Sequence, residues 1–340
     1  MKLNSSSSNL LKIETDSLIL PTGSQLKNHS KLIDKALEGS ISALIKAGDF
    51  SGKIADTCIL HTLDHSFKRI ILVGTDGSLT PQTIQTIISA ANAAVLKTSS
   101  NQVTWVGDGL GEDHNWQSSM IARDSITSVY KYSGTTKTPD PAKLNQVTYW
   151  CSLKTQISVA NKGLIFGGAV GEGMNITRQL GNLPANICTP NYLAKEAQQL
   201  AKGNANLKTT ILKEADMKEL KMGSLLSVSA GSVEPGNLII MNYQGTSSQV
   251  KPVVLVGKAV TFDTGGISLK PGRGMDEMKF DMCGGASVFG VITALLKSKL
   301  PINVIGIVPA VENMPAGNAT KPGDVCLLYT SDAADEEASV

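Results

Sequence analysis

Two lysines and two aspartates lie close together in this sequence, at Lys258, Asp263, Lys270 and Asp281. Carboxylate oxygens are the ligands that hard divalent cations prefer, and two carboxylates that converge need a cation between them. A lysine can join such a site only as the neutral amine, and the charge of a nearby metal ion favours that form. These residue types at this spacing therefore predict a charged pocket around divalent metal.

A strand, a glycine turn and a helix start are needed to bring these side chains together. The apolar run 252–257 is a predicted strand, and Lys258 follows at its carboxyl end, the edge at which open α/β sheets bind ligands. The two glycines after Asp263 allow a sharp turn and a close approach to a ligand. Asp281 comes just before a segment rich in small residues that is a predicted helix.

Each charged residue also has a simpler structural explanation. Lys258 alone reads as the solvated end of a strand, Asp263 as the first residue of an Asx-turn, and Asp281 as a helix N-cap. Together these explanations are weaker, because a structural turn has no need for four charges around a Gly-Gly bend beside an apolar strand. The metal site remains the favoured interpretation of the cluster.

Short apolar runs alternate with segments of helical period along most of the chain, which indicates an α/β protein. In the first half, the predicted strands are 10–14, 18–21, 68–74 and 102–107, and the predicted helices are 31–48, 81–97 and 116–129. In the second half, the predicted strands are 207–212, 237–244, 252–257 and 301–310, and the predicted helices are 191–202, 214–221 and 284–297. A long helix is predicted between the halves. We expect an N-terminal α/β domain at 1–160, a connecting helix at 161–187, a second α/β domain with a mixed central sheet at 188–325, and a tail at 326–340.

Composition narrows the class of protein. A chain of 340 residues with 41% apolar content suggests two ordinary globular domains. The net charge is only +2 and no basic stripe is present, so nucleic-acid binding is not expected. Five scattered cysteines without a CxxC spacing fit reduced thiols. The N-terminus lacks the apolar core of a secretory signal, and no run approaches the roughly 18 apolar residues that span a bilayer. We therefore expect a cytoplasmic protein without a membrane partner.

The remaining motifs point to no other chemistry. The segment GDGLGE (107–112) follows a strand, but Glu112 replaces the last glycine of a dinucleotide-binding motif, so a simple turn is favoured. No P-loop and no GxSxG nucleophile elbow occurs. His61 and His65 are expected on the surface, and His29 and His114 are expected to be solvated. A histidine-based catalytic site is therefore not predicted.

Around the charged cluster the sequence resembles a known family. The stretch 256–288, VGKAVTFDTGGISLKPGRGMDEMKFDMCGGASV, closely resembles the cytosolic leucyl aminopeptidases, which use two metal ions. Residues 180–194, 222–239 and 302–325 add to this resemblance. It is strong over about 160–325, whereas the N-terminal part is similar in layout only. The resemblance implies an N-terminal α/β domain joined by a long helix to an α/β catalytic domain.

The resemblance also implies roles for individual residues. Lys258 through its amine, Asp263 as a bridge and Asp281 would hold two divalent ions, Zn or Mn, and the ion at Asp281 would also receive the α-amino group of the substrate. Lys270 would be the catalytic lysine that polarises the scissile carbonyl. Met278 would line the pocket for the N-terminal side chain. The implied reaction is hydrolysis of leucine-like N-terminal residues from peptide substrates, in a cytoplasmic homohexamer.

One part of the family pattern is not found. The family continues after PGDV to N-T-D-A-E-G-R, which supplies an Asp and a Glu as metal ligands and an Arg for catalysis. Here CLLYTSDAADEEASV follows, and its SDAADEE lacks the Gly-Arg and comes too early. We therefore expect a C-terminally truncated fragment with an incomplete catalytic domain, inactive and poorly soluble alone. Two alternatives are a nucleotide- or DNA-binding role of the N-terminal domain and a non-catalytic homologue.

Overall fold

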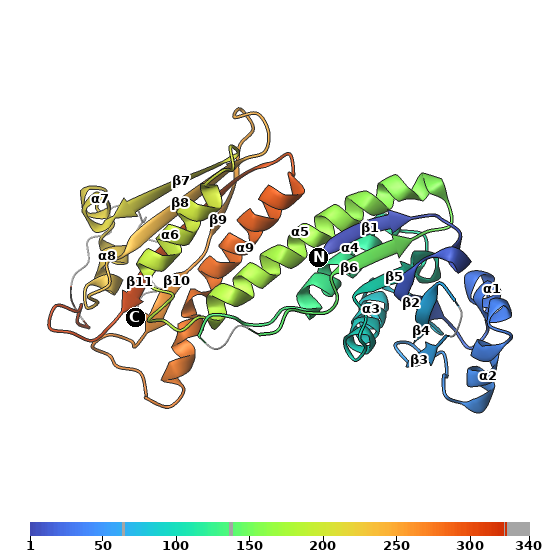
Figure 1. The fold of residues 1–340 in the computed structure, drawn as a ribbon. Helices are drawn as coiled ribbons and strands as arrows, with labels where there is room; N and C mark the ends of the chain where they lie inside the picture. The colour runs from blue at the N-terminus through green and yellow to red at the C-terminus, as the bar shows by residue number, and fades with distance from the viewer. Residues whose placement is uncertain (63–64, 136–138, 323, 325–340) are drawn as a thin grey trace. The chain divides into compact units, whose positions relative to one another are not determined.

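The computed structural model describes residues 1–62, 65–135, 139–322 and 324 of the chain, which form two compact units (Figure 1). Unit 1 comprises Met1–Lys131 and Pro139–Glu172, and unit 2 comprises Tyr132–Thr138 and Gly173–Val340. The boundary after Glu172 falls inside the long helix α5 (Ile157–Asn182). The expected tail, 326–340, lies outside the described residues.

Unit 1 is built on a six-stranded sheet with the strand order β1-β6-β5-β2-β4-β3. Neighbouring strands are parallel except β3 and β4, which are antiparallel. The strands are β1 (Lys2–Ser6), β2 (Thr15–Thr22), β3 (Thr57–His61), β4 (Phe67–Gly74), β5 (Gln102–Val106) and β6 (Gln146–Trp150). The helices are α1 (Asn28–Ala36), α2 (Ser40–Ala47), α3 (Pro81–Leu96) and α4 (His114–Ser128).

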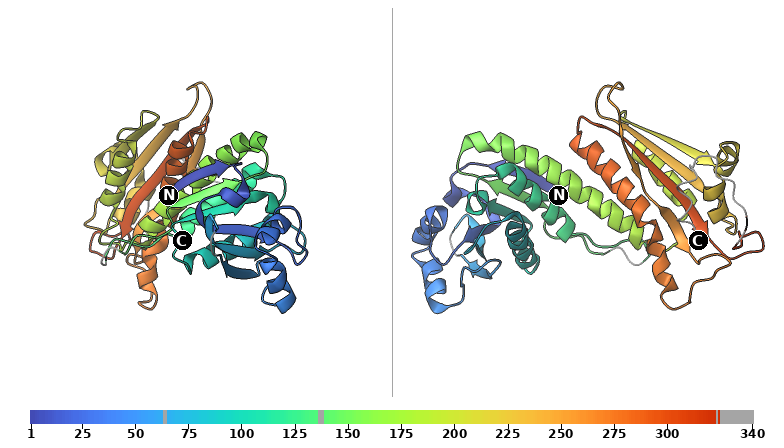
Figure 2. Two further views of the ribbon diagram at one scale, coloured as in Figure 1. Left: turned by 45° about the vertical axis from the view of Figure 1, so that its right-hand side comes forward. Right: turned by 180° about the vertical axis from the view of Figure 1, so that it is seen from behind.

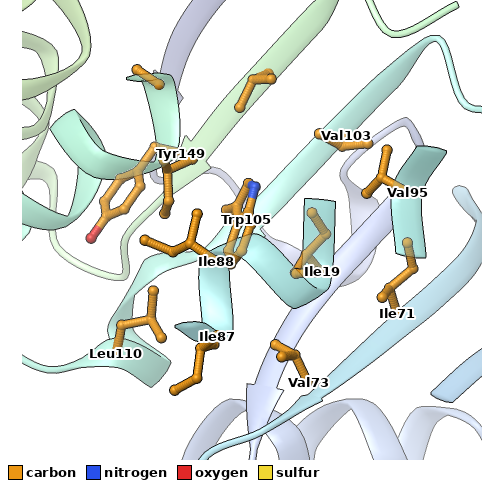
Figure 3. Close-up of a cluster of buried hydrophobic side chains, with 14 of the residues drawn as sticks. Ile19, Ile71, Val73, Ile87, Ile88, Val95, Val103, Trp105, Leu110 and Tyr149 are labelled. Atoms are coloured by element: carbon orange, nitrogen blue, oxygen red, sulfur yellow. The ribbon is translucent and has the colours of Figure 1, made fainter. Parts of the chain in front are cut away.

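Both faces of the unit 1 sheet are covered by apolar side chains. The central strand β2 is buried along its whole length, and its side chains alternate between two cores. Ile19 packs with α3, α4 and α5 in the core shown in Figure 3, whereas Leu18 and Leu20 pack with α1 and α2 on the other side. A parallel sheet buried on both faces explains why these strands read as continuous apolar runs.

Unit 2 is built on a mixed sheet around β11 (Asn303–Asn313). β11 is antiparallel to β8 and parallel to β9 and β10, and β7 is antiparallel to β8. The other strands are β7 (Leu207–Lys213), β8 (Asn237–Gln244), β9 (Val253–Val256) and β10 (Ala259–Asp263). The helices are α6 (Pro190–Ala201), α7 (Glu214–Glu219), α8 (Gly223–Ser229) and α9 (Cys283–Ser298), with the 3-10 helix η4 (Met275–Met282) before α9.

One face of this sheet carries the core of unit 2. Alternate residues of β8 and β11, such as Met241 and Val308, are buried against α6 and α9. Figure 2 shows α9 lying along the sheet beside β11. β9 and β10 follow one another along the same edge of β11, and β10 ends at Asp263 opposite Asn313. The α/β class with a mixed second sheet is therefore confirmed.

Several local predictions were wrong. Residues 10–14 were expected to form a strand, but Leu10–Lys12 form a 3-10 helix η1 after Asn9, whose side chain accepts the N–H of Leu11. The single helix expected at 31–48 is two helices, because Gly39 adopts the left-handed conformation (φ 83°) between them. Strands β1, β3, β6 and β10 were not predicted. Their short runs carry polar residues that hide the apolar pattern.

One helical stretch, Met275–Ser298, is long and apolar enough to cross a membrane by length and composition alone. The sequence had been expected to lack such a run. Half of its most apolar part is buried in the protein, and Phe289, Ile292 and Leu295 of α9 pack in the core of unit 2. The stretch therefore has the features of a core helix.

Candidate active site

The charged residues of the sequence cluster lie on consecutive elements of unit 2. Lys258 stands between β9 and β10, and Asp263 is the last residue of β10. The turn after Asp263 leads to Lys270 and then to η4, which carries Met278 and Asp281. β10 packs directly against η4. These five residues form the candidate site.

Lys258 and Asp281 form one ion pair of the candidate site. The Nζ of Lys258 lies 2.9 Å from the Oδ2 of Asp281. The main chain is fixed at this point, because the N–H of Gly285 donates to the carbonyl oxygen of Lys258 over 2.7 Å. Gly257 permits this contact between strand and helix, since a Cβ there would lie 2.4 Å from the carbonyl oxygen of Gly284. The strand end and the start of α9 are thus locked together.

Asp263 and Lys270 form the second ion pair. The Oδ2 of Asp263 accepts from the Nζ of Lys270, and its Oδ1 accepts from the N–H of Gly265 over 3.0 Å. The Oδ1 also accepts from the Nδ2 of Asn313 over 2.8 Å. Burial by itself raises the pKa of Asp263, but these three donors outweigh it and hold the pKa below its usual range. The Asx-turn considered for Asp263 is present as well, in its bond to Gly265.

The glycine turn folds Lys270 back onto Asp263. Gly265 and Gly266 have φ values of 85° and 67°, which side chains other than glycine rarely adopt. The N–H of Lys270 donates to the carbonyl oxygen of Thr264 over 2.8 Å and closes the turn. The Nζ of Lys270 also lies 3.2 Å from the sulfur of Met278. Lys270 therefore contacts two other residues of the candidate site, Asp263 and Met278.

Asp281 is not the N-cap of α9. That helix begins at Cys283, its N-cap is Met282, and no side-chain cap bond is made. The Oδ2 of Asp281 is buried and has no hydrogen-bond partner in the described part of the chain. The Lys258 amine is within ion-pair distance of it but is not oriented for a hydrogen bond. A buried carboxylate oxygen without a donor is costly unless a cation compensates it.

This donor set fits a hard divalent ion. Asp263 and Asp281 supply carboxylate oxygens, and Lys258, whose side chain is 62% exposed, can supply an amine. This set of metal ligands is small. No three His, Cys, Asp or Glu side chains converge anywhere in residues 1–62, 65–135, 139–322 and 324. The described residues alone therefore provide at most three ligands at the candidate site.

Asn313 contacts Asp263 of the candidate site and was missed from the sequence. It ends β11, which runs parallel to β10, so both strands place their last residues at the same edge of the sheet. That rule had been applied to Lys258 but not to the longer strand 301–310. The signal that could have found Asn313 is its position as a polar residue just beyond the carboxyl end of the apolar strand 301–310.

The histidines and the glycine motif lie in unit 1. His61 and His65 are exposed, as predicted, but His114 is buried, which contradicts the prediction. Its Nδ1 lies 2.8 Å from the hydroxyl of Tyr149, and this partner offsets its desolvation. His29 is half-buried and pairs with Asp108 of the glycine motif at 3.1 Å.

A cavity of about 510 Å³ lies at the carboxyl ends of β2, β4 and β5 in unit 1. His29, Asp76, Asp108 and Gly109 contribute to its lining. The glycine motif itself begins as the short 3-10 helix η2 (Gly107–Leu110). The cavity is formed by unit 1 alone, and none of the five candidate-site residues lines it.

Two family models match this chain. The catalytic domain of the cytosol aminopeptidase family matches residues 175–333, and the N-terminal domain of the same family matches residues 19–138. The chain belongs to the cytosol aminopeptidase family. The candidate site falls inside the catalytic-domain match, whereas the unit 1 cavity falls inside the N-terminal match or at its edge.

Curated relatives agree with this assignment. The chain is 41% identical to a probable cytosol aminopeptidase of Nitrosococcus oceani, over 88% of this chain and 62% of that protein. It is 40% identical to the cytosol aminopeptidase of Pseudomonas aeruginosa, over 93% of this chain and 65% of that protein. The chain thus spans less than two thirds of the length of these relatives.

Solved structures show the same fold. A mutant tomato leucine aminopeptidase matches with a TM-score of 0.80 and 26% identity, over 95% of this chain and 65% of that one. The bottromycin maturation enzyme BotP in complex with Mn matches with a TM-score of 0.73 and 27% identity, over 91% of this chain and 62% of that one.

Proposed function

We propose that the candidate site serves a metal-dependent aminopeptidase that removes leucine-like residues from the N-termini of peptides. The observation that carries this proposal is the pairing of Lys258 with Asp281 and of Lys270 with Asp263 at one edge of the unit 2 sheet. Opposite charges gathered on adjoining elements are suited to holding cations and a polar substrate. Family membership supports the same reaction.

Asp263, Asp281 and the amine of Lys258 would hold two divalent ions, Mn²⁺ or Zn²⁺. The buried Oδ2 of Asp281 accepts no hydrogen bond from the residues that the structure describes and lies 2.9 Å from the Lys258 amine, which supports a cation-binding role at this position. One relative in the solved structures binds Mn, which favours manganese. When bound, such ions supply Lewis-acid activation of water and of the scissile carbonyl.

Lys270 and Met278 would act on the substrate. The ammonium of Lys270 would donate to the scissile carbonyl oxygen and stabilise the negative charge that develops there. Its contact with the sulfur of Met278 sets the two side chains beside each other, so an apolar N-terminal side chain would pack against Met278. Asp281 would hold the ion that also receives the α-amino group of the peptide.

The proposal also includes assembly and location. We expect a cytoplasmic homo-oligomer, a hexamer in the full-length enzyme, that acts on soluble peptides. Sedimentation velocity of the purified protein at micromolar concentration would test this part. A monomer at micromolar concentration would contradict it without touching the assignment of the candidate site.

Manganese binding by this chain tests the metal assignment. Isothermal titration calorimetry with Mn²⁺ should give a binding isotherm that disappears in Asp263→Asn and Asp281→Asn. Lys251→Ala, an exposed lysine outside the candidate site, is the matched control and should bind Mn²⁺ as the unaltered chain does. If the two aspartate variants bound Mn²⁺ as tightly as the unaltered chain, the assignment would be overturned.

Hydrolysis of leucyl p-nitroanilide on the same samples tests the catalytic role of Lys270. Any release should disappear with EDTA, return with Mn²⁺, and be lost in Lys270→Ala but not in Lys251→Ala. The ratio of the rates of the two lysine variants decides the role of Lys270. A Lys270→Ala rate equal to that of Lys251→Ala would contradict the role.

A further inference from the structure

The two oxygens of the Asp263 carboxylate have different surroundings. Oδ1 accepts two hydrogen bonds, from the N–H of Gly265 and from the side-chain amide of Asn313. Oδ2 faces Lys270. The carboxylate of an aspartate can rotate about the Cβ–Cγ bond, and the χ2 angle has no sharp preference. The hydrogen-bond donors therefore decide which oxygen faces the candidate site.

Asn313 is anchored independently of this contact. Its carbonyl oxygen accepts the N–H of Thr264 over 3.0 Å and the hydroxyl of Thr264 over 2.9 Å. Thr264 is 5% exposed and directly follows Asp263. The backbone of Asn313 and the backbone at Asp263 therefore move as one piece, and the amide keeps a fixed distance to the carboxylate.

The orientation of the amide is fixed as well. Only its Nδ2 can donate, so it faces the carboxylate, while Oδ1 lies on the side of Gly266. A Cβ on Gly266 would lie 3.0 Å from that Oδ1, so the glycine turn packs closely against the amide. Asn313 thereby fills the space between β10 and the turn that carries Lys270.

We propose that Asn313 is the positioning residue of the candidate site, and that its amide holds the Asp263 carboxylate with Oδ2 directed at the site. This inference rests on the proposed function, because the purpose of the orientation is to present Oδ2 to a cation. Asn313 itself touches neither substrate nor ion in this role. It acts through Asp263, as residues that orient metal ligands do.

The test replaces the amide of Asn313 by side chains that cannot donate a hydrogen bond. Asn313→Leu removes the donor and keeps water from its place, and Asn313→Ala removes the donor but admits water. Glu312→Gln is the matched control, because consecutive strand residues point to opposite faces and Glu312 contacts Ser232. Mn²⁺ affinity is measured by calorimetry, and the thermal midpoint of each variant is measured alongside it.

Losses of metal affinity after removing such an orienting partner are about 10–100-fold. We expect a loss in this range for Asn313→Leu, a smaller loss for Asn313→Ala, and none for Glu312→Gln, with unchanged thermal midpoints. A merely structural role of Asn313 would instead lower the midpoint and leave the affinity of the folded protein unaltered. That result, or full affinity in Asn313→Leu, would overturn the inference.

A crystal structure of Asn313→Leu separates this inference from the proposed function. If the unaltered chain binds no Mn²⁺, or Asp263→Asn binds it equally well, the metal assignment fails. The orientation of Asp263 in the crystal still decides the role of Asn313. A carboxylate turned away from Lys270 supports the positioning role, and an unmoved carboxylate rejects it.

Discussion

The sheets of the two units are covered to different degrees. In unit 1 both faces of the sheet are packed, and β2 has no exposed residue. In unit 2, α6 and α9 cover one face, and the other face presents a row of apolar side chains. Val254 and Val256 of β9 are 51% and 70% exposed, and the adjoining Ile305, Ile307 and Ile240 are half-buried.

This difference separates stability from function in the molecule. The cavity of unit 1 lies at one end of a sheet whose two faces are both covered by helices of the same unit. The candidate site of unit 2 lies on β9 and β10, which pair on one side only, with β11, among the described residues. Substitutions in unit 1 should therefore change folding alone, whereas substitutions at the β9–β10 edge should change metal binding and self-association.

The largest effect is expected from emptying the core of unit 1. Ile71 is fully buried, and Ile71→Ala should lower the free energy of unfolding by about 2–5 kcal/mol, because it removes buried methyl groups and leaves a cavity. All three tryptophans, Trp105, Trp116 and Trp150, lie in unit 1, so urea unfolding followed by their fluorescence reports this unit alone.

Leu153→Ala is the control for this measurement, since Leu153 is 56% exposed and its removal should change little. Mn²⁺ binding should be equal in both variants if stability and function are separate. A folded Ile71→Ala chain that binds Mn²⁺ weakly would break the comparison between the units.

Much of this architecture could be predicted from the sequence. The longer apolar runs, such as 68–74 and 237–244, became strands, because a strand buried on one or both faces needs that pattern. Helix α3 was predicted from Thr80 and Pro81, and Thr80 does cap it by accepting the N–H of Thr83 over 3.2 Å. Edge strands such as β1 were missed, since exposure removes the apolar signal.

The candidate site was predicted only in part. The pairing of Lys258, Asp263, Lys270 and Asp281 follows from local elements, so sequence spacing was sufficient to gather them. Asn313 comes from a strand that is distant in sequence, and only the parallel pairing of β10 with β11 brings it to Asp263. The burial of His114 likewise depends on a partner, Tyr149, that no local pattern reveals.

A tight glycine contact sharpens the comparison in unit 2. A Cβ on Gly257 would lie 2.4 Å from the carbonyl oxygen of Gly284 and 2.7 Å from Val288, so Gly257→Ala should push the strand end away from α9. Overpacking of this kind costs about 1–3 kcal/mol. We expect weaker Mn²⁺ binding, a lower midpoint by far-UV circular dichroism, and an unchanged fluorescence transition from unit 1.

Gly272→Ala is the matched control, because a Cβ there meets no atom within 4 Å. It should keep both the Mn²⁺ affinity and the midpoint of unit 2. If Gly257→Ala lowers the fluorescence transition too, the two units unfold together and the comparison has to be abandoned.

Acid should weaken unit 1 through Asp16. Burial raises the pKa of Asp16, but Lys68 and the N–H groups of Asn101 and Gln102 outweigh this and lower the pKa below its usual range. The charged form is thus favoured by folding, and its contribution is present above about pH 4 and lost as the pH falls through the lowered pKa. Asp16→Asn should cost about 1–3 kcal/mol at neutral pH.

The measurement is fluorescence-monitored unfolding between neutral and acidic pH. Unaltered protein should lose more stability than Asp16→Asn does below about pH 4, so the two curves should approach each other. Asp49→Asn, an exposed aspartate, should follow the unaltered protein at every pH. Parallel curves for Asp16→Asn would show that another group carries the acid sensitivity.

The smallest effect on stability is expected at the uncovered face of unit 2. Val254→Lys places a charge on an exposed edge strand, and surface changes of this kind usually stay within about 0.5 kcal/mol. Light scattering should show less self-association, because the charge interrupts the row of apolar side chains. The same change at Val73, which is fully buried in unit 1, should unfold that unit. Val254→Lys could instead destabilise unit 2 as strongly as the change at Val73 destabilises unit 1. That result would show that a second copy of the chain covers this face in solution, so that the contrast between the two sheets holds only for the isolated chain.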